Sequence, residues 1–122
     1  MNYDEFDDAF IEYIKEQASN FKPEKDSDFE INQENYSKVV IITCLLKRIS
    51  NPNYDIVHQI EMTPRYKTGR VIADFTGLSL KEESLSDFEK ILHLSDDVGI
   101  DAQLDGTLHL EFLVKDVFEK VN

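Results

Sequence analysis

The feature that most constrains the fold of this chain is an apolar run between Tyr36 and Ile49. Its Val, Ile, Thr and Leu residues occupy both parities, so neither side of an extended segment would be polar. Residues branched at Cβ favour strands, and a strand that is apolar on both sides has to be covered on both faces. The run therefore predicts a central strand, in a sheet whose second face is covered by helices or by another copy of the chain.

Two further strands are expected to follow. An Asn-Pro-Asn turn signal at residues 51–53 precedes residues 56–62, which alternate apolar and polar side chains and predict a hairpin with the central strand. A basic turn over residues 65–70 is interpreted as a solvated hairpin tip. A third strand over residues 71–75 should then direct alternate apolar side chains into the core.

Helices are expected at two places. Aromatic and aliphatic residues recur at spacings of three, four and seven near the N-terminus, which predicts an amphipathic helix from Asn2 to Ala18. Residues 22–35 contain a proline and lack a sustained period, so we interpret them as an acidic connector. Ser86 and Glu89 have the spacing of a capping box, which predicts a short helix from Asp87 to Leu94.

The last hairpin is the most closely specified element. Alternate apolar residues of 98–102 must share a face with those of 108–112, and this parity requires a loop with an odd number of residues. A loop over residues 104–106, with its glycine in the left-handed conformation, satisfies the requirement. In this register Asp101 lies opposite His109 on the outer face of the hairpin.

These elements predict one α+β domain over residues 1–122. Its sheet should be mostly antiparallel with about five strands, and the N-terminal helix and the second short helix should pack on it. Residues 114–121 are expected to add one or two helical turns. A chain of 122 residues is long enough to bury one hydrophobic core rather than two.

The charge of the chain limits its partners. A net charge of −12 disfavours direct binding of nucleic acid or of an anionic membrane, because both ligands reward basic patches. Residues 1–35 hold 11 acids and 3 bases, residues 73–122 hold 12 acids and 4 bases, and residues 36–72 hold 2 acids and 6 bases. We therefore expect any macromolecular partner to be basic.

Cellular location follows from the termini and from cysteine content. The acidic N-terminus lacks the features of a secretory signal, and no apolar run reaches the roughly 20 residues that cross a bilayer. The single cysteine, Cys44, lies in the apolar run, where a buried and inert thiol is expected. The sequence therefore predicts a cytoplasmic protein.

No arrangement of residues in the sequence predicts a catalytic or metal-binding site. The three histidines are far apart in sequence and no C-x-x-C motif is present, so we expect no metal and no other cofactor. His58 is interpreted as a core or rim histidine and His93 as a residue at a helix C-terminus. Asp101 and His109 form a cross-strand surface pair without a nucleophile. We predict no catalytic residue, and the chain is not expected to be an enzyme.

These features favour a protein that acts by binding a basic protein partner. One concrete form is a bacterial immunity protein or antitoxin that neutralises a nuclease-like toxin stoichiometrically, because opposite charges accelerate association. The acids expected to make the contact lie near the N-terminus: Asp4, Asp7, Asp8, Glu12, Asp26, Asp28 and Glu30.

Two alternatives stay open. The first is a small-ligand-binding or enzymatic domain with a site between sheet and helices, using His58 or His109 together with Arg70. A deep polar pocket would favour it. The second is a structural or assembly subunit that acts as a homodimer, which a large exposed apolar face would favour.

Overall fold

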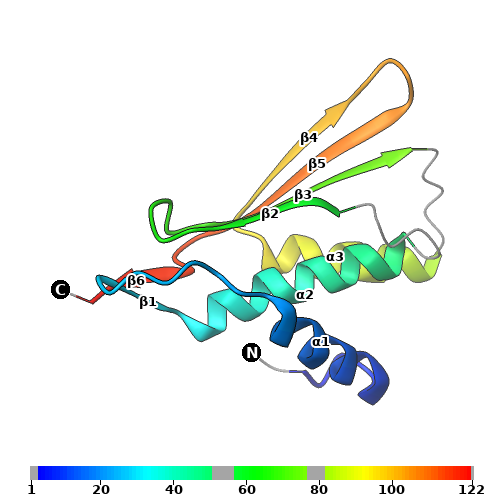
Figure 1. Cartoon of the computed structure of the whole chain (residues 1–122). Coiled ribbons are helices and arrows are strands. Elements are labelled where there is room, and N and C mark those ends of the chain that lie inside the picture. The colour runs from blue at the N-terminus through cyan, green and yellow to red at the C-terminus, as the bar shows by residue number, and fades with distance from the viewer. Residues whose placement is uncertain (1–2, 51–56, 77–81, 122) are drawn as a thin grey trace.

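The computed structural model describes residues 3–50, 57–76 and 82–121, which form three helices and six strands (Figure 1). In chain order the elements are α1 (Asp8–Asn20), β1 (Phe29–Ile31), α2 (Gln33–Ile49), β2 (Val57–Met62), β3 (Gly69–Thr76), α3 (Glu82–Leu94), β4 (Asp97–Ala102), β5 (Thr107–Val114) and β6 (Phe118–Lys120). The fold is α+β, as the sequence predicts. A four-stranded sheet has the order β2-β3-β5-β4, β1 and β6 form a second sheet, and all pairs are antiparallel.

The apolar run from Tyr36 to Ile49 is helical, so the prediction of a central strand there is wrong. The side chain of Asn32 caps α2 by accepting a hydrogen bond from a first-turn N–H at 3.0 Å, and Lys47 and Arg48 lie in the last turn. Residues 39–46 are all buried. A run that is apolar on both parities is also apolar around a helix, and this helix is enclosed by its neighbours.

The arrangement of the layers explains why α2 is buried on all sides. Figure 1 shows α2 beneath the four-stranded sheet, with α3 beside it and α1 on its far side. The predicted hairpin between residues 36–49 and 56–62 is therefore absent, and β2 pairs with β3 instead. The turn signal at residues 51–53 lies outside the described residues. Burial raises the pKa of Cys44 to about 12, which agrees with the expected inert thiol.

β3 and β5 form the centre of the sheet. Val71, Ala73 and Phe75 are buried as predicted, and they pair with inward-facing residues of β5. The last hairpin is also confirmed. Ala102 pairs with Leu108, and Gly106 has a φ of 89°.

The predicted helical turns over residues 114–121 are wrong. Phe118 begins β6, which pairs with β1 inside residues 22–35, where the sequence predicts an acidic connector. The Asn32 N–H donates to the Val117 carbonyl at 2.9 Å, next to this pair. Val117 and Phe118 are both buried, so the segment packs as an extended chain against the core.

Both amphipathic helices differ from prediction at their N-termini. α1 begins after Asp7, whose carboxylate accepts a hydrogen bond from the Phe10 N–H at 2.7 Å. α3 begins at Glu82, so Ser86 lies within the helix and the capping-box interpretation is wrong. His93 lies in the last turn of α3, as expected.

Candidate partner-binding surface

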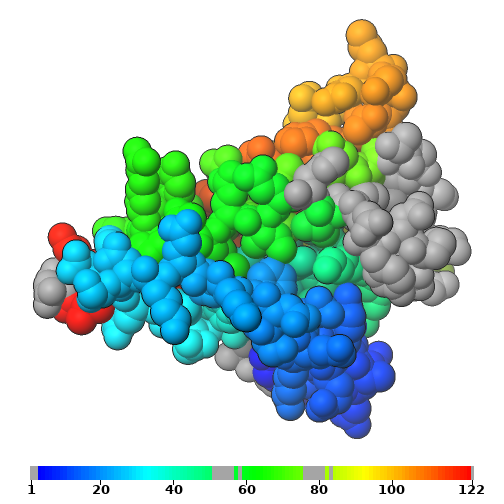
Figure 2. Space-filling model, viewed as in Figure 1, coloured from blue at the N-terminus to red at the C-terminus, as the bar shows by residue number. Residues whose placement is uncertain are grey.

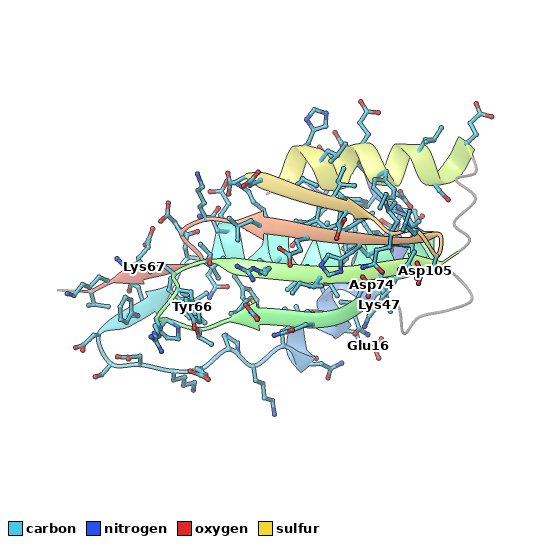
Figure 3. All side chains as sticks on the ribbon, turned by 90° about the horizontal axis from the view of Figure 1, so that it is seen from above. Glu16, Lys47, Tyr66, Lys67, Asp74 and Asp105 are labelled. Atoms are coloured by element: carbon cyan, nitrogen blue, oxygen red, sulfur yellow. The ribbon has the colours of Figure 1, made fainter. Side chains whose placement is uncertain are left out.

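Helices cover the four-stranded sheet on one face. α2 and α3 pack against the inner face, and Figure 1 shows the opposite face turned away from all three helices of the described chain. Because side chains alternate along a strand, the register places one set of residues on this outer face. The set, which we call the open face, is Gln59, Glu61, Arg70, Ile72, Asp74, Thr76, Asp97, Gly99, Asp101, Thr107, His109, Glu111 and Leu113. Figure 3 looks onto the open face, with Asp74 labelled near its centre.

The open face is rich in carboxylates. Its acids are Glu61, Asp74, Asp97, Asp101 and Glu111, and Arg70 is its one permanently charged base. Ile72 and Leu113 add apolar area between them. A surface of this composition attracts cations, and it repels other acidic surfaces.

His109 lies at the centre of the open face between two carboxylates. Its Nδ1 atom is 2.5 Å from Asp74 Oδ1, and its Nε2 atom is 3.4 Å from Glu111 Oε1. These hydrogen bonds, the one to Asp74 above all, raise the pKa of His109 above its ordinary value of 6.5, although partial burial acts in the opposite direction. The register pairs His109 with Asp101 as predicted, but the imidazole contacts Asp74 on β3 instead of Asp101 on β4.

This arrangement favours charge stabilisation over acid–base chemistry. A general base needs a ring nitrogen with a lone pair facing the substrate. Both nitrogens of His109 face carboxylates, and the protonated imidazole can donate to both at once. Among the described residues, no three His, Cys, Asp or Glu side chains converge so as to hold a metal ion.

Two shallow hollows adjoin Arg70 on the open face. One, of about 180 Å³, is lined by Arg70, Asp97, Val98, Gly99, Glu111 and Leu113. The other, of about 360 Å³, is lined by Glu61, Tyr66, Thr68 and Arg70. Gly99 opens the first hollow, because a Cβ atom there would meet only Glu111 Cβ, at 3.8 Å. Arg70 Nη1 lies 3.9 Å from Glu61 Oε2, so the guanidinium stands between the hollows in a loose ion pair.

The structure divides the acids predicted as contact residues into two groups. Asp4, Asp7, Asp8 and Glu12 lie before α1 and in its first turns, whereas Asp26, Asp28 and Glu30 lie in and before β1. Figure 2 shows these two stretches, dark blue and light blue, on separate parts of the surface.

Some of these acids already have partners within the chain. Asp7 caps α1, and Asp26 Oδ1 accepts a hydrogen bond from the Asp28 N–H at 2.9 Å. Glu12 pairs with Lys15 at 3.7 Å. These contacts are all local, and those of Asp26 and Glu12 are exposed, so none of them joins the two groups into one surface.

The residues named for a small-ligand site do not lie between sheet and helices. Arg70 and His109 both belong to the open face, on the side of the sheet away from α2. His58 lies at an irregularity of the β2–β3 register, and its side chain is outside the part of the chain that the structure describes.

Sequence reasoning missed the partner of His109. Asp74 lies 35 residues before His109, and only the adjacency of β3 and β5 brings the two together. The alternation of polar residues in 70–76 and 107–111 was a usable signal that each strand has a polar face. It does not say which strands are neighbours.

Comparison of the chain with protein-family models, with curated proteins and with solved structures found no match. None of the helices in the described ranges is both long and apolar enough to cross a bilayer.

Proposed function

We propose that the protein binds a basic protein partner in the cytoplasm and that the open face is its contact surface. The observation that carries this proposal is the open face itself, where five carboxylates and one guanidinium occupy a sheet face that none of the described helices covers. The net charge of −12 also attracts a basic partner from a longer distance. An immunity protein that neutralises a toxin by stoichiometric binding is one concrete form of such a protein.

The physical argument concerns both the rate and the specificity of association. Opposite net charges steer the two proteins together, which suits a binder that has to neutralise its target quickly. At contact, the hollow between Asp97 and Glu111 offers two carboxylates to a basic side chain of the partner. Leu113 lines the same hollow and can pack against the aliphatic part of that side chain.

Two variants with the same change in charge test where the contact lies. The open-face variant carries Glu61→Gln, Asp97→Asn, Asp101→Asn and Glu111→Gln, which leaves the contact between His109 and Asp74 in place. The matched variant carries Asp4→Asn, Asp8→Asn, Glu12→Gln and Asp28→Asn near the N-terminus. The partner is first captured from extracts of the native organism at low salt, identified by mass spectrometry and purified. Calorimetric titration of that purified protein then gives the dissociation constants.

We expect the open-face variant to bind at least about tenfold more weakly than the wild-type protein, and the matched variant to bind nearly as tightly as wild type. Wild-type affinity should fall as salt is raised, since salt screens exposed charges. A loss confined to the matched variant would move the contact to the N-terminal acids. An affinity insensitive to salt and to both variants would contradict a basic partner.

The homodimer alternative is tested separately, by sedimentation of the isolated protein. A homodimer buried through the open face would place the carboxylates of two copies against each other, which is unfavourable. We therefore expect a monomer. A stable dimer that the open-face variant strengthens would support the structural subunit in place of the proposed function.

A further inference from the structure

β4 is an edge strand of the four-stranded sheet, on the side of α3 (Figure 3). In the β4–β5 ladder, the Gln103 N–H donates to the Thr107 carbonyl at 2.8 Å, which fixes the phase of the hydrogen bonds. Alternate residues counted back from Gln103 direct their backbone groups toward β5. The N–H and C=O groups of Ile100 and Ala102 therefore point outward from the sheet, where the described residues place no further strand.

Three of the large apolar side chains that the described chain exposes lie on α3 and β4. Ile100 is 68% exposed, and Leu85 and Leu92 are 51% and 50% exposed. On α3, Leu85 and Leu92 are three residues before and four residues after Phe88, so the three share one side of the helix. The ring of Phe88 lies 6.5 Å from that of Phe75 in the sheet, so this side of α3 faces the sheet layer.

Among the described residues, no strand lies on the outer side of β4. Figure 3 shows α3 lying past the β4 edge, and Figure 1 shows the β4–β5 hairpin diverging from α3 toward its tip. The hairpin also projects from the rest of the surface in Figure 2. Because Phe88 faces the sheet layer, Leu85 and Leu92 lie on the side of α3 that is turned toward the sheet, and Ile100 belongs to the face of β4 that is turned toward the helices.

The opposite side of β4 is acidic. Asp97 and Asp101 stand on the open face, with Gly99 between them. A strand added here would therefore meet carboxylates on one side and apolar side chains on the other. Side chains of an extended segment alternate between its two sides, so the matching segment alternates basic and apolar residues.

We propose that β4 accepts an extended segment of the basic partner as an additional strand, whose basic side chains face Asp97 and Asp101 and whose apolar side chains cover Ile100, Leu85 and Leu92. This inference rests on the proposed function and specifies its form. Charge complementarity selects this occupant over a second copy, because each copy carries a net charge of −12 and pairing of two β4 strands would bring their aspartates together.

A synthetic peptide of about ten alternating lysine and valine residues serves as the probe, because strands of this length are common in sheets. The control peptide has the same sequence, but every second backbone amide is N-methylated. N-methylation keeps every charge and removes the N–H donors along one edge of the extended peptide. We expect N-methylation on the pairing edge to weaken binding at least about tenfold. Amide exchange measured by NMR should slow at Ile100 when the unmodified peptide binds.

Two variants extend the test to the purified partner protein. Ile100→Lys places a charge on the apolar side of the β4 edge, and Leu104→Lys makes the same change in charge at the fully exposed loop of the same hairpin. Both native side chains are exposed, so both variants should fold, which their circular dichroism can verify. We expect Ile100→Lys to weaken binding at least about tenfold more than Leu104→Lys does.

Several results would overturn the proposal. If both peptides bind equally, or if neither binds, or if the two lysine variants behave alike, β4 does not accept a strand. The proposed function survives those results as long as the purified partner still binds in a salt-dependent way. A wild-type dimer that Ile100→Lys dissociates would show that a second copy occupies β4, which also overturns the proposal.

Discussion

At Gly69 the missing side chain allows β3 to approach α2 closely. A Cβ atom at this position would overlap Val39 Cγ2 and would lie 3.2 Å from Val117 Cγ2, and both valines are buried. We expect Gly69→Ala to lower the free energy of unfolding by about 1–3 kcal/mol, the range typical of overpacked cores. Urea denaturation measures this change.

Gly99→Ala is the matched control for this prediction. A Cβ atom at Gly99 meets only Glu111 Cβ, at 3.8 Å, so alanine should be neutral or slightly stabilising in the strand. Equal stability of the two alanine variants would show that Val39 moves aside at little cost. In that case the close approach of β3 and α2 would not require glycine.

His109 should make the stability of the protein depend on pH. Asp74 from β3 and Glu111 from β5 contact it and both favour the imidazolium, and Asp101 from β4 is its register partner on the same face. A pKa raised in the folded state gives a stabilisation that is complete below the unfolded-state value and is lost as pH rises through the folded-state pKa. Unfolding of the wild-type protein and of His109→Gln should therefore differ more at about pH 5.5 than at about pH 8.

The control removes a different histidine. His93 is exposed on α3, and its Nε2 atom lies 3.9 Å from Glu89 Oε1. His93→Gln removes an imidazole outside the open face, and it should change stability at about pH 5.5 by much less than His109→Gln does, because the pair with Glu89 is exposed. An NMR titration of His109 that gives a pKa at or below 6.5 would contradict the prediction.

Among the elements, Arg48 links the three described helices, through an ion pair between α2 and α3 and a cation–π contact with α1. Arg48 of α2 donates to both carboxylate oxygens of Asp87 in α3, at 2.8 and 2.6 Å, and its guanidinium lies 3.8 Å from the ring centroid of Phe10 in α1. The Asp87 side chain is 11% exposed and that of Arg48 is 33% exposed. In exposure, the pair is intermediate between surface ion pairs, which contribute little to the free energy of unfolding, and fully buried ion pairs.

We expect Asp87→Asn to destabilise the protein by about 1–3 kcal/mol, because Arg48 keeps its charge and loses a bidentate partner. Thermal and urea unfolding both measure the change. Glu89→Gln, on the exposed side of the same helix, is the control and should change stability by less than about 0.5 kcal/mol. Equal effects at the two positions would show that the ion pair contributes little.

Element type was predictable where the pattern excludes alternatives. The parity of residues 98–102 and 108–112 allows only an odd loop, so the register of that hairpin could be derived from the sequence alone. The pattern of the run from Tyr36 to Ile49 does not distinguish a strand from a helix, because a strand covered on both faces and an enclosed helix are both apolar throughout. Its length and the capping residue Asn32 favour a helix, and they were the signals to weigh against its β-branched composition.

For the whole molecule, the fold class was predictable and the open face was not. Composition and strand patterns were sufficient to predict an α+β domain with antiparallel pairs. The open face depends on the order β2-β3-β5-β4, which joins strands on either side of α3, and local patterns carry no information about such long-range neighbours. The acids near the N-terminus were conspicuous in the sequence because they are contiguous there, whereas those of the open face are scattered over four strands.

The pairing of β1 with β6 has a consequence for the order in which the chain can fold. The Asn32 side chain, which caps α2, donates from Nδ2 to Glu119 at 2.8 Å across a separation of 87 residues. During synthesis, the contacts at the beginning of α2 can form completely only after β6 has left the ribosome. Until then the most apolar helix of the chain is without its final neighbours, and we expect nascent chains at that stage to depend most on chaperones.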